Sequence, residues 1–345
     1  MLPALLAKTA GSDAWISAGI GTLVELAVLY IALTVLHRNQ YTDIYATLRG
    51  TKSPVLGQAI AKTVLTAMFA MFLLQIFILV NQAFYLLNEN MFESIPIKFF
   101  AIPMLILGVF FCFMPSRAIF RSGEIFFIFI IIGIALSVFP AVTNIDVREV
   151  LPIFGSGVGA SANAFYLNLI YFESAFFLLM FMGDIKIEKH FRKKFMTTAV
   201  ILGAFFVFFV FMFCALFGPL ASFKQIAVTD LTIYSNYITA SGRLDWLLVT
   251  MWLLLLLLRF GITFFCAFKC LKYVFDFKFL KHKHEFISFI LAIAVYFVSI
   301  FVFVTSRDVA RFIGAIPGLI VALYVAVPVL FLVISLVKRG RKKNV

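Results

Sequence analysis

The chain has 345 residues, of which 63% are hydrophobic and 13% are charged, and its mean hydropathy is +1.08. A soluble domain is about half apolar and about a quarter charged, so this composition excludes a soluble globular protein and predicts an integral membrane protein. The formal net charge of +13 comes mainly from lysines and arginines in short loops, as membrane orientation requires, so we expect no binding to nucleic acid.

Nine apolar segments follow one another along the chain, and each is long enough to cross a bilayer as a helix. Because these runs are continuous and do not alternate with polar residues, they favour a helix bundle over a transmembrane barrel. The sequence therefore predicts an all-α polytopic membrane protein with a single transmembrane domain. Its predicted spans cover residues 14–36, 58–87, 98–114, 118–142, 164–183, 195–222, 243–272, 286–305 and 312–337, and residues 338–345 form a basic tail.

A polar connection over residues 144–163 separates the fourth and fifth spans, and it contains Gly155, Gly157 and Gly159. This spacing resembles a phosphate-binding loop only superficially, because no strand precedes it. We therefore expect a flexible loop between two helices.

The charges of the loops predict the orientation of the chain. The loops after the first, third, fifth and seventh spans, with the adjoining span ends and the tail, carry twenty Lys and Arg, against seven on the opposite side. Cytoplasmic loops are enriched in these residues, so we expect a cytoplasmic C-terminus. Nine spans then place the N-terminus outside, which suggests that a leading helix is missing.

The span over residues 164–183 carries a carboxylate, Glu173, near its middle. A charge at the centre of a bilayer costs about 3 kcal/mol or more, so such a residue normally faces a polar cavity or a partner. Two roles remain open: Glu173 coordinates a ligand or a proton, or it pairs with a neighbouring helix. Its neighbours are weaker candidates for a ligand site, since packing is the better explanation for each of them alone: Asn168, Tyr171, Phe172 and Ser174.

Three further polar side chains lie within predicted spans. Arg259 would either pair with Glu173 or a ligand carboxylate, or extend towards the cytoplasmic face. Gln75 would hydrogen-bond either a ligand or another helix. For Glu25 we favour a structural role.

The sequence contains no arrangement of residues that indicates catalysis or a metal site. No histidine, serine or cysteine has a base and an orienting partner beside it, so we expect no enzymatic activity. Cys266 and Cys270 share a helical face, but two thiols without a nearby histidine make a poor metal site. We therefore expect neither a metal nor a cofactor.

Four stretches of the chain, in order, resemble one protein family. They are LPALLAKTAGSDAWISAGIGTL from Leu2, VLPIFGSG from Val150, FESAFFLLMFMGDIK from Phe172 and SGRLDW from Ser241. Together they resemble the B subunits of spore germination receptors, the GerAB-type permeases of endospore-forming bacteria. The resemblance covers essentially the whole chain.

This resemblance implies a fold and a location for the ligand. The family is similar to the amino acid–polyamine–organocation transporters, which implies ten helices in two inverted five-helix repeats, with helices one and six broken at the midplane, where the ligand binds. Residues 164–183 would then be helix six. Tyr171 stands where transporter relatives usually have glycine, so we expect less unwinding there. We expect the first half of helix one to be absent, apart from a remnant around residues 2–8.

The resemblance also implies a function. The chain would be the nutrient-sensing subunit of a germination receptor in the inner membrane of the spore, and it would act with companion receptor subunits. A small nutrient, most simply an L-amino acid, would bind between helices one, three, six and eight. The alternatives are a secondary amino-acid transporter coupled to H⁺ or Na⁺, and a truncated copy without function.

Overall fold

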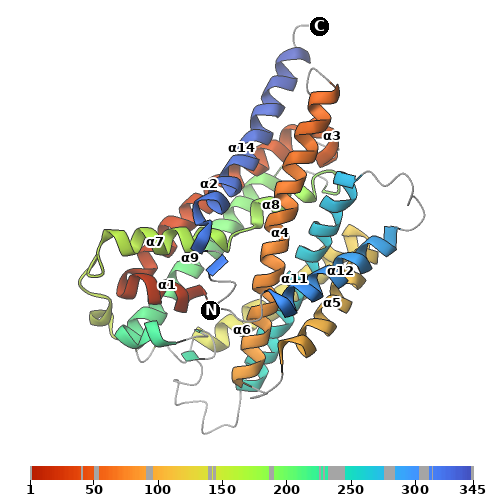
Figure 1. Cartoon of the computed structure of the whole chain (residues 1–345). Helices are drawn as coiled ribbons and strands as arrows, with labels where there is room; N and C mark the ends of the chain where they lie inside the picture. Colours follow the sequence, from red (N-terminus) through yellow and green to blue (C-terminus); the bar gives the residue numbers. More distant parts are fainter. Residues whose placement is uncertain are drawn as a thin grey trace.

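The structure is a computed structural model that describes residues 2–39, 42–49, 54–90, 96–138, 142, 145–185, 190–224, 227, 230–231, 245–275, 284–302, 311–312 and 314–342. Over these residues the chain forms α-helices and short 3-10 segments, and no strand is present in them. Figure 1 shows the helices as a bundle, with the C-terminal end of α14 (Pro317–Lys342) at one extremity. The protein is an all-α polytopic membrane protein.

A helix, or a pair of helices, lies over each of the nine predicted spans. Six segments of the described chain are long and apolar enough to cross a membrane, whereas α5 and α12 contain shorter apolar stretches. The predicted span over residues 164–183 corresponds to two helices, α7 (Val158–Ile170) and α8 (Ser174–Met180). One helix lies over each of the other eight spans: α2 (Ala14–Arg38), α4 (Pro54–Asn90), α5 (Ile97–Phe113), α6 (Ser116–Val138), α9 (Phe191–Phe217), α11 (Asp245–Phe275), α12 (His284–Phe301) and α14.

The short helix α1 (Leu2–Ala10) contains the predicted remnant over residues 2–8. Its buried face packs against α7 and the 3-10 segment η4 (Gly218–Phe223). Gly11 has a φ of +55°, a conformation that suits glycine, and it turns the chain into η1 (Gly11–Asp13) and α2. A second short helix, α3 (Ile44–Arg49), follows α2.

The prediction of a flexible loop over residues 144–163 is wrong for its last part, because α7 already begins at Val158. The preceding turn is held by the buried carboxylate of Asp13, which accepts hydrogen bonds from the backbone N–H groups of Phe154 (2.7 Å) and Ser156 (3.0 Å). Since these donors would otherwise lack a partner, the carboxylate orders the entry to α7.

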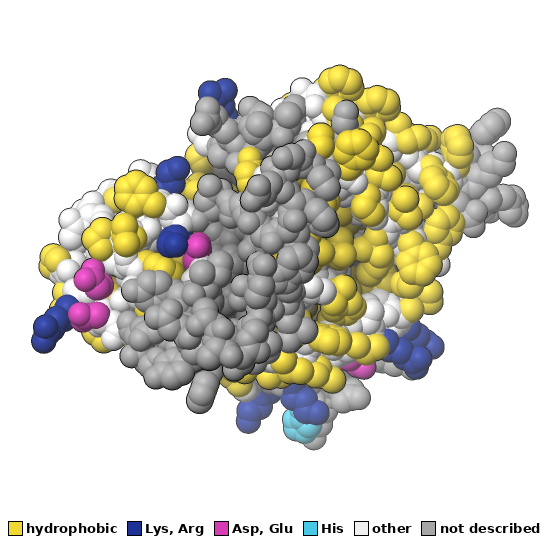
Figure 2. Space-filling model, turned by 90° about the horizontal axis from the view of Figure 1, so that it is seen from below, with side chains coloured by type: hydrophobic (Ala, Val, Ile, Leu, Met, Phe, Trp, Pro, Cys, Tyr) yellow, Lys and Arg dark blue, Asp and Glu magenta, His cyan; other side chains and the backbone are white. Residues whose placement is uncertain are grey.

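The flank formed by α5 and α12 is covered with exposed apolar side chains, including Phe110 and Ile106 on α5 and Phe297 and Ile293 on α12. Figure 2 shows hydrophobic side chains gathered on the side of the molecule where these two helices lie. Soluble proteins rarely expose contiguous apolar side chains in this way, so this flank is suited to contact with lipid.

Glycines allow α11 to approach its neighbour α5 closely. A Cβ atom on Gly261 of α11 would lie 2.7–2.8 Å from ring atoms of Phe111, and one on Gly108 of α5 would lie 2.7 Å from Phe264. Such distances are closer than van der Waals contact, so each glycine meets an aromatic ring of the other helix. Small residues commonly let helices pack closely within membranes.

The substitution Gly261→Ala should therefore destabilise the protein by about 1–3 kcal/mol, because the added methyl group overpacks the interface with Phe111. Gly123→Ala on α6 is the matched control, since a Cβ atom added there would meet nothing within 4 Å. The midpoint of thermal unfolding in detergent should fall for Gly261→Ala relative to Gly123→Ala. Equal midpoints would show that the two helices can separate without cost.

Candidate functional site

The central helix is broken where Glu173 lies. Helix α7 ends at Ile170 and α8 begins at Ser174, so three residues are left without regular helical structure. Two side chains from other helices bond to carbonyl groups at the break: Gln75 Nε2 donates to the Ile170 oxygen (2.5 Å) and Arg259 Nη2 to the Tyr171 oxygen (3.0 Å). Buried backbone groups need such partners in a membrane, so α4 and α11 stabilise the break.

The helix is broken at Tyr171, and the expectation of less unwinding than in glycine-containing relatives stays a prediction. The break occurs without a glycine, because it does not need a left-handed backbone conformation at this position: Tyr171 has φ −84° and ψ −7°. The backbone N–H groups of Tyr171 and Phe172 bond to the carbonyl oxygens of Asn168 (3.1 Å) and Leu169 (3.2 Å), which closes α7 with a tighter final turn.

Glu173 forms an ion pair across the break. Its Oε1 accepts a hydrogen bond from Arg259 Nε at 2.7 Å. The glutamate is 4% exposed, whereas the arginine side chain is 37% exposed and reaches a more open space. The second carboxylate oxygen, Oε2, is buried and has no hydrogen-bond partner among the described residues. Among the roles predicted for Arg259, pairing with Glu173 is therefore the one that the structure contains.

A cavity of about 500 Å³ lies beside this ion pair, a volume typical of small-molecule sites. Five of the seven predicted site residues line it: Tyr171, Phe172, Glu173, Ser174 and Arg259. The rest of its wall is apolar or aromatic except for one amide, and consists of Leu2, Leu79, Gln82, Leu86, Phe177, Phe206, Trp252, Leu255 and Leu256. The cavity therefore combines one buried charge pair with a largely apolar surface.

The other two predicted site residues do not line the cavity. Asn168 is fully buried, and its Nδ2 donates to the carbonyl oxygens of Ser17 (3.4 Å) and Ala18 (3.3 Å) on α2. Gln75 bonds to the end of α7, as described above. Both side chains join α7 to a neighbouring helix, so they position the break instead of facing the cavity.

Three aromatic residues of the wall, Phe177, Phe206 and Trp252, are absent from the prediction. The sequence does contain a signal for Trp252, because it precedes Arg259 by seven residues, or two helical turns, and such residues share a face. Its Nε1 is buried without a hydrogen-bond partner in the described ranges. For Phe206 there is no signal, since the chain contains 45 phenylalanines.

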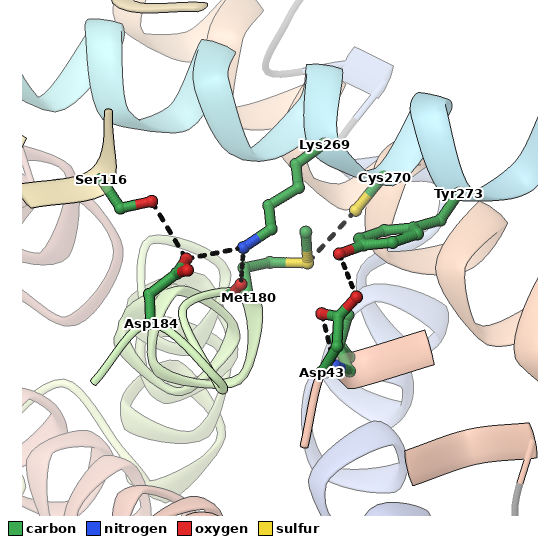
Figure 3. Close-up of polar contacts among 8 residues, drawn as sticks. Asp43, Ser116, Met180, Asp184, Lys269, Cys270 and Tyr273 are labelled. Carbon is green, nitrogen blue, oxygen red and sulfur yellow. Dashed lines mark hydrogen bonds and ion pairs between the residues drawn. The ribbon is translucent and has the colours of Figure 1, made fainter. Parts of the chain in front are cut away.

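A second group of polar contacts joins the C-terminal end of α8 to the C-terminal half of α11. We call it the Lys269 cluster; it comprises Asp43, Ser116, Asp184, Lys269 and Tyr273 (Figure 3). Lys269 Nζ donates to the Met180 carbonyl oxygen (2.8 Å) and to Asp184 Oδ2 (2.9 Å). The Ser116 hydroxyl donates to the same carboxylate at 3.0 Å, and the Tyr273 hydroxyl donates to Asp43.

The ion pair at the break and the Lys269 cluster connect the same two segments. Lys269 follows Arg259 by ten residues on α11, which is about 15 Å of helix, and α8 lies between Glu173 and Asp184. Helix α11 therefore contributes the cation of both ion pairs, and the segment that contains α8 contributes both carboxylates. A shift of α8 along α11 at the cavity would strain both pairs.

In a comparison with protein families, the family model described as a spore germination protein, Spore_permease, matches residues 1–308. This range includes every residue that lines the cavity and every member of the Lys269 cluster. No curated protein matches the chain.

Proposed function

The chain belongs to the spore germination permease family, and from this premise we propose that it is the nutrient-sensing subunit of a germination receptor. Its ligand is a small zwitterion such as an L-amino acid, and the cavity at the helix break is the binding site. The observation that carries this proposal is the Glu173–Arg259 pair, which places both signs of charge at one apolar cavity. The location is the inner membrane of the spore, with the C-terminus in the cytoplasm.

An amino acid is complementary to this arrangement of charges. Its ammonium group can donate to Glu173 Oε2, the oxygen that lacks a partner within the described chain. Its carboxylate can accept from the guanidinium of Arg259, which is partly exposed. Hydrogen bonds to charged groups contribute about 1.5–3 kcal/mol each. The leucine and aromatic side chains of the wall suit an apolar side chain on the ligand.

Binding becomes a signal if the ligand prefers one conformation of the bundle. A ligand that contacts both Glu173 and Arg259 changes the relative position of α8 and α11 at the cavity. Because the same two segments meet again at the Lys269 cluster, this change reaches the end of the bundle where α3 lies (Figure 1). Companion receptor subunits that contact this end would then respond to it.

Purified protein in lipid nanodiscs, screened against the twenty common L-amino acids, tests the ligand. We expect one or a few of them to raise the midpoint of thermal unfolding, because a ligand at 100 times its Kd stabilises the folded state by about 2.7 kcal/mol. The effect should disappear in Glu173→Gln and persist in Glu124→Gln, an exposed glutamate on α6. Stabilisation that survives Glu173→Gln would show that the ligand binds elsewhere.

The same protein in proteoliposomes separates sensing from transport. A sensing subunit should bind the labelled amino acid without accumulating it in the vesicles under a gradient of H⁺ or Na⁺. Accumulation that Glu173→Gln abolishes would identify a coupled secondary transporter instead. If no amino acid is bound and none is accumulated, the proposed ligand class is wrong.

A further inference from the structure

A second carboxylate, Glu25, lies in the middle of α2 and is only 6% exposed. One of its oxygens accepts a hydrogen bond from the hydroxyl of Tyr324 on α14. The other, Oε1, is buried, and no described residue bonds to it. None of the ion pairs in the described part of the chain includes this glutamate. From α9, Arg192 lies over the ring of Tyr30 instead, at 4.2 Å.

The side chains that surround Glu25 on the other described helices do not balance the charge of an ionised carboxylate. Tyr324 approaches from α14, and Ser174 and Glu173 approach from the beginning of α8. The charge of Glu173 is already balanced by Arg259. In the part of the chain that the structure describes, Glu25 and Glu173 interact electrostatically, and only Glu173 is paired with a cation. If both were ionised, one buried negative charge would remain uncompensated, which costs about 3 kcal/mol or more within a membrane.

We propose that Glu25 is a proton-binding site, in which the carboxylic acid donates from Oε1 to the Ser174 hydroxyl while Tyr324 donates to Oε2. Binding one proton neutralises the excess charge and gives both oxygens a hydrogen-bond partner. A metal ion does not fit, because one carboxylate and two hydroxyls provide too few oxygens to replace its hydration shell. No group of three or more potential metal ligands occurs among the described residues either.

This assignment differs from the structural role that the sequence favours for Glu25. The difference arises from Ser174, which lines the cavity and also lies beside Glu25. Ser174 therefore belongs both to the surroundings of Glu25 and to the wall of the cavity. The proposal itself does not depend on the nature of the ligand, and it can be tested on the protein alone.

Infrared difference spectroscopy of the whole protein in lipid, between neutral and alkaline pH, tests the site. We expect a carbonyl stretching band of a protonated carboxylic acid at neutral pH in the wild type. The band should be lost in Glu25→Gln and retained in Glu124→Gln, which changes an exposed glutamate on α6. Absence of the band in the wild type, or its persistence in Glu25→Gln, would overturn the proposal.

A second variant keeps the test valid even if the Glu25→Gln protein does not fold. Tyr324→Phe removes the donor to Oε2 and leaves the carboxylic acid in place, so the band should remain and move to higher frequency. The amide bands of the same spectra report whether each variant keeps its helical structure. A band whose frequency is unchanged in a helical Tyr324→Phe protein would exclude Glu25 as the protonated group.

Discussion

Replacing Arg259 by glutamine should raise the nutrient concentration needed for a half-maximal germination response by about 100-fold or more. The substitution removes the cation that pairs with Glu173 and that we propose to bind the nutrient carboxylate. Truncating one partner of a buried, hydrogen-bonded charge pair at a binding interface weakens binding by about 2–5 kcal/mol, and the partial exposure of Arg259 places the effect in the lower half of that range. The measurement is the nutrient dependence of germination in spores that carry the variant as their only copy of this subunit.

Controls must separate a loss of recognition from a loss of stability. Arg121→Gln, at an exposed arginine on α6, should leave the response unchanged. The double variant Arg259→Gln, Glu173→Gln contains no uncompensated buried charge at the break, so its thermal stability should recover relative to Arg259→Gln alone. Its nutrient response should not recover. A double variant that responds like the wild type would mean that the pair only supports the fold.

The part of the site that could be predicted from sequence is the pair of charged residues, because burying a charge in a membrane costs free energy. Glu173 and Arg259 are charged residues within apolar spans, and a charge in a membrane requires a partner or a cavity. That reasoning predicted that the two could pair, and the structure places them 2.7 Å apart although 86 residues separate them. The cavity then includes the neighbours of Glu173 that lie within the break.

The direction of the remaining side chains could not be predicted in the same way. Asn168 and Gln75 are polar residues within spans, as Glu173 is, yet they bond to neighbouring helices. Which side of a helix faces a cavity depends on how the whole bundle is rotated and packed, and an amide is satisfied by any nearby carbonyl group. Likewise, Tyr324 is 299 residues from Glu25, and no local pattern indicates that they meet.

The helices themselves follow from continuous apolar runs, and a helix or a pair of helices lies over each of these runs. The break between α7 and α8 depends instead on side chains from α4 and α11 that bond to its carbonyl groups, which is why the residue types at the break do not reveal its backbone. The arrangement of ten helices as two inverted repeats stays a prediction from the family resemblance. A broken central helix with a cavity beside it is the feature that the structure shares with that expectation.

Replacing Lys269 by methionine should activate the receptor without nutrient and raise the rate of spontaneous germination in buffer by about 10- to 100-fold. Methionine keeps much of the apolar side chain but removes the ammonium group that bonds to Asp184 and to the Met180 carbonyl oxygen. One hydrogen bond to a charged group contributes about 1.5–3 kcal/mol, and that difference changes a two-state equilibrium by this factor. We expect activation and not inhibition because the contacts of Lys269 hold α8 against α11 in the arrangement that Figure 3 shows, and their loss frees α8 to move.

Two companion variants make this result specific to the cluster. Lys272→Met removes an exposed lysine one turn further along α11 and should leave germination dependent on nutrient. Lys269→Arg keeps a cation within reach of Asp184 and should restore most of the wild-type behaviour. Immunoblots of spore membranes confirm that each variant is present at comparable levels. If Lys269→Met spores keep the nutrient dependence of the wild type, the cluster only supports the fold, and the signal from the cavity must leave the bundle by another route.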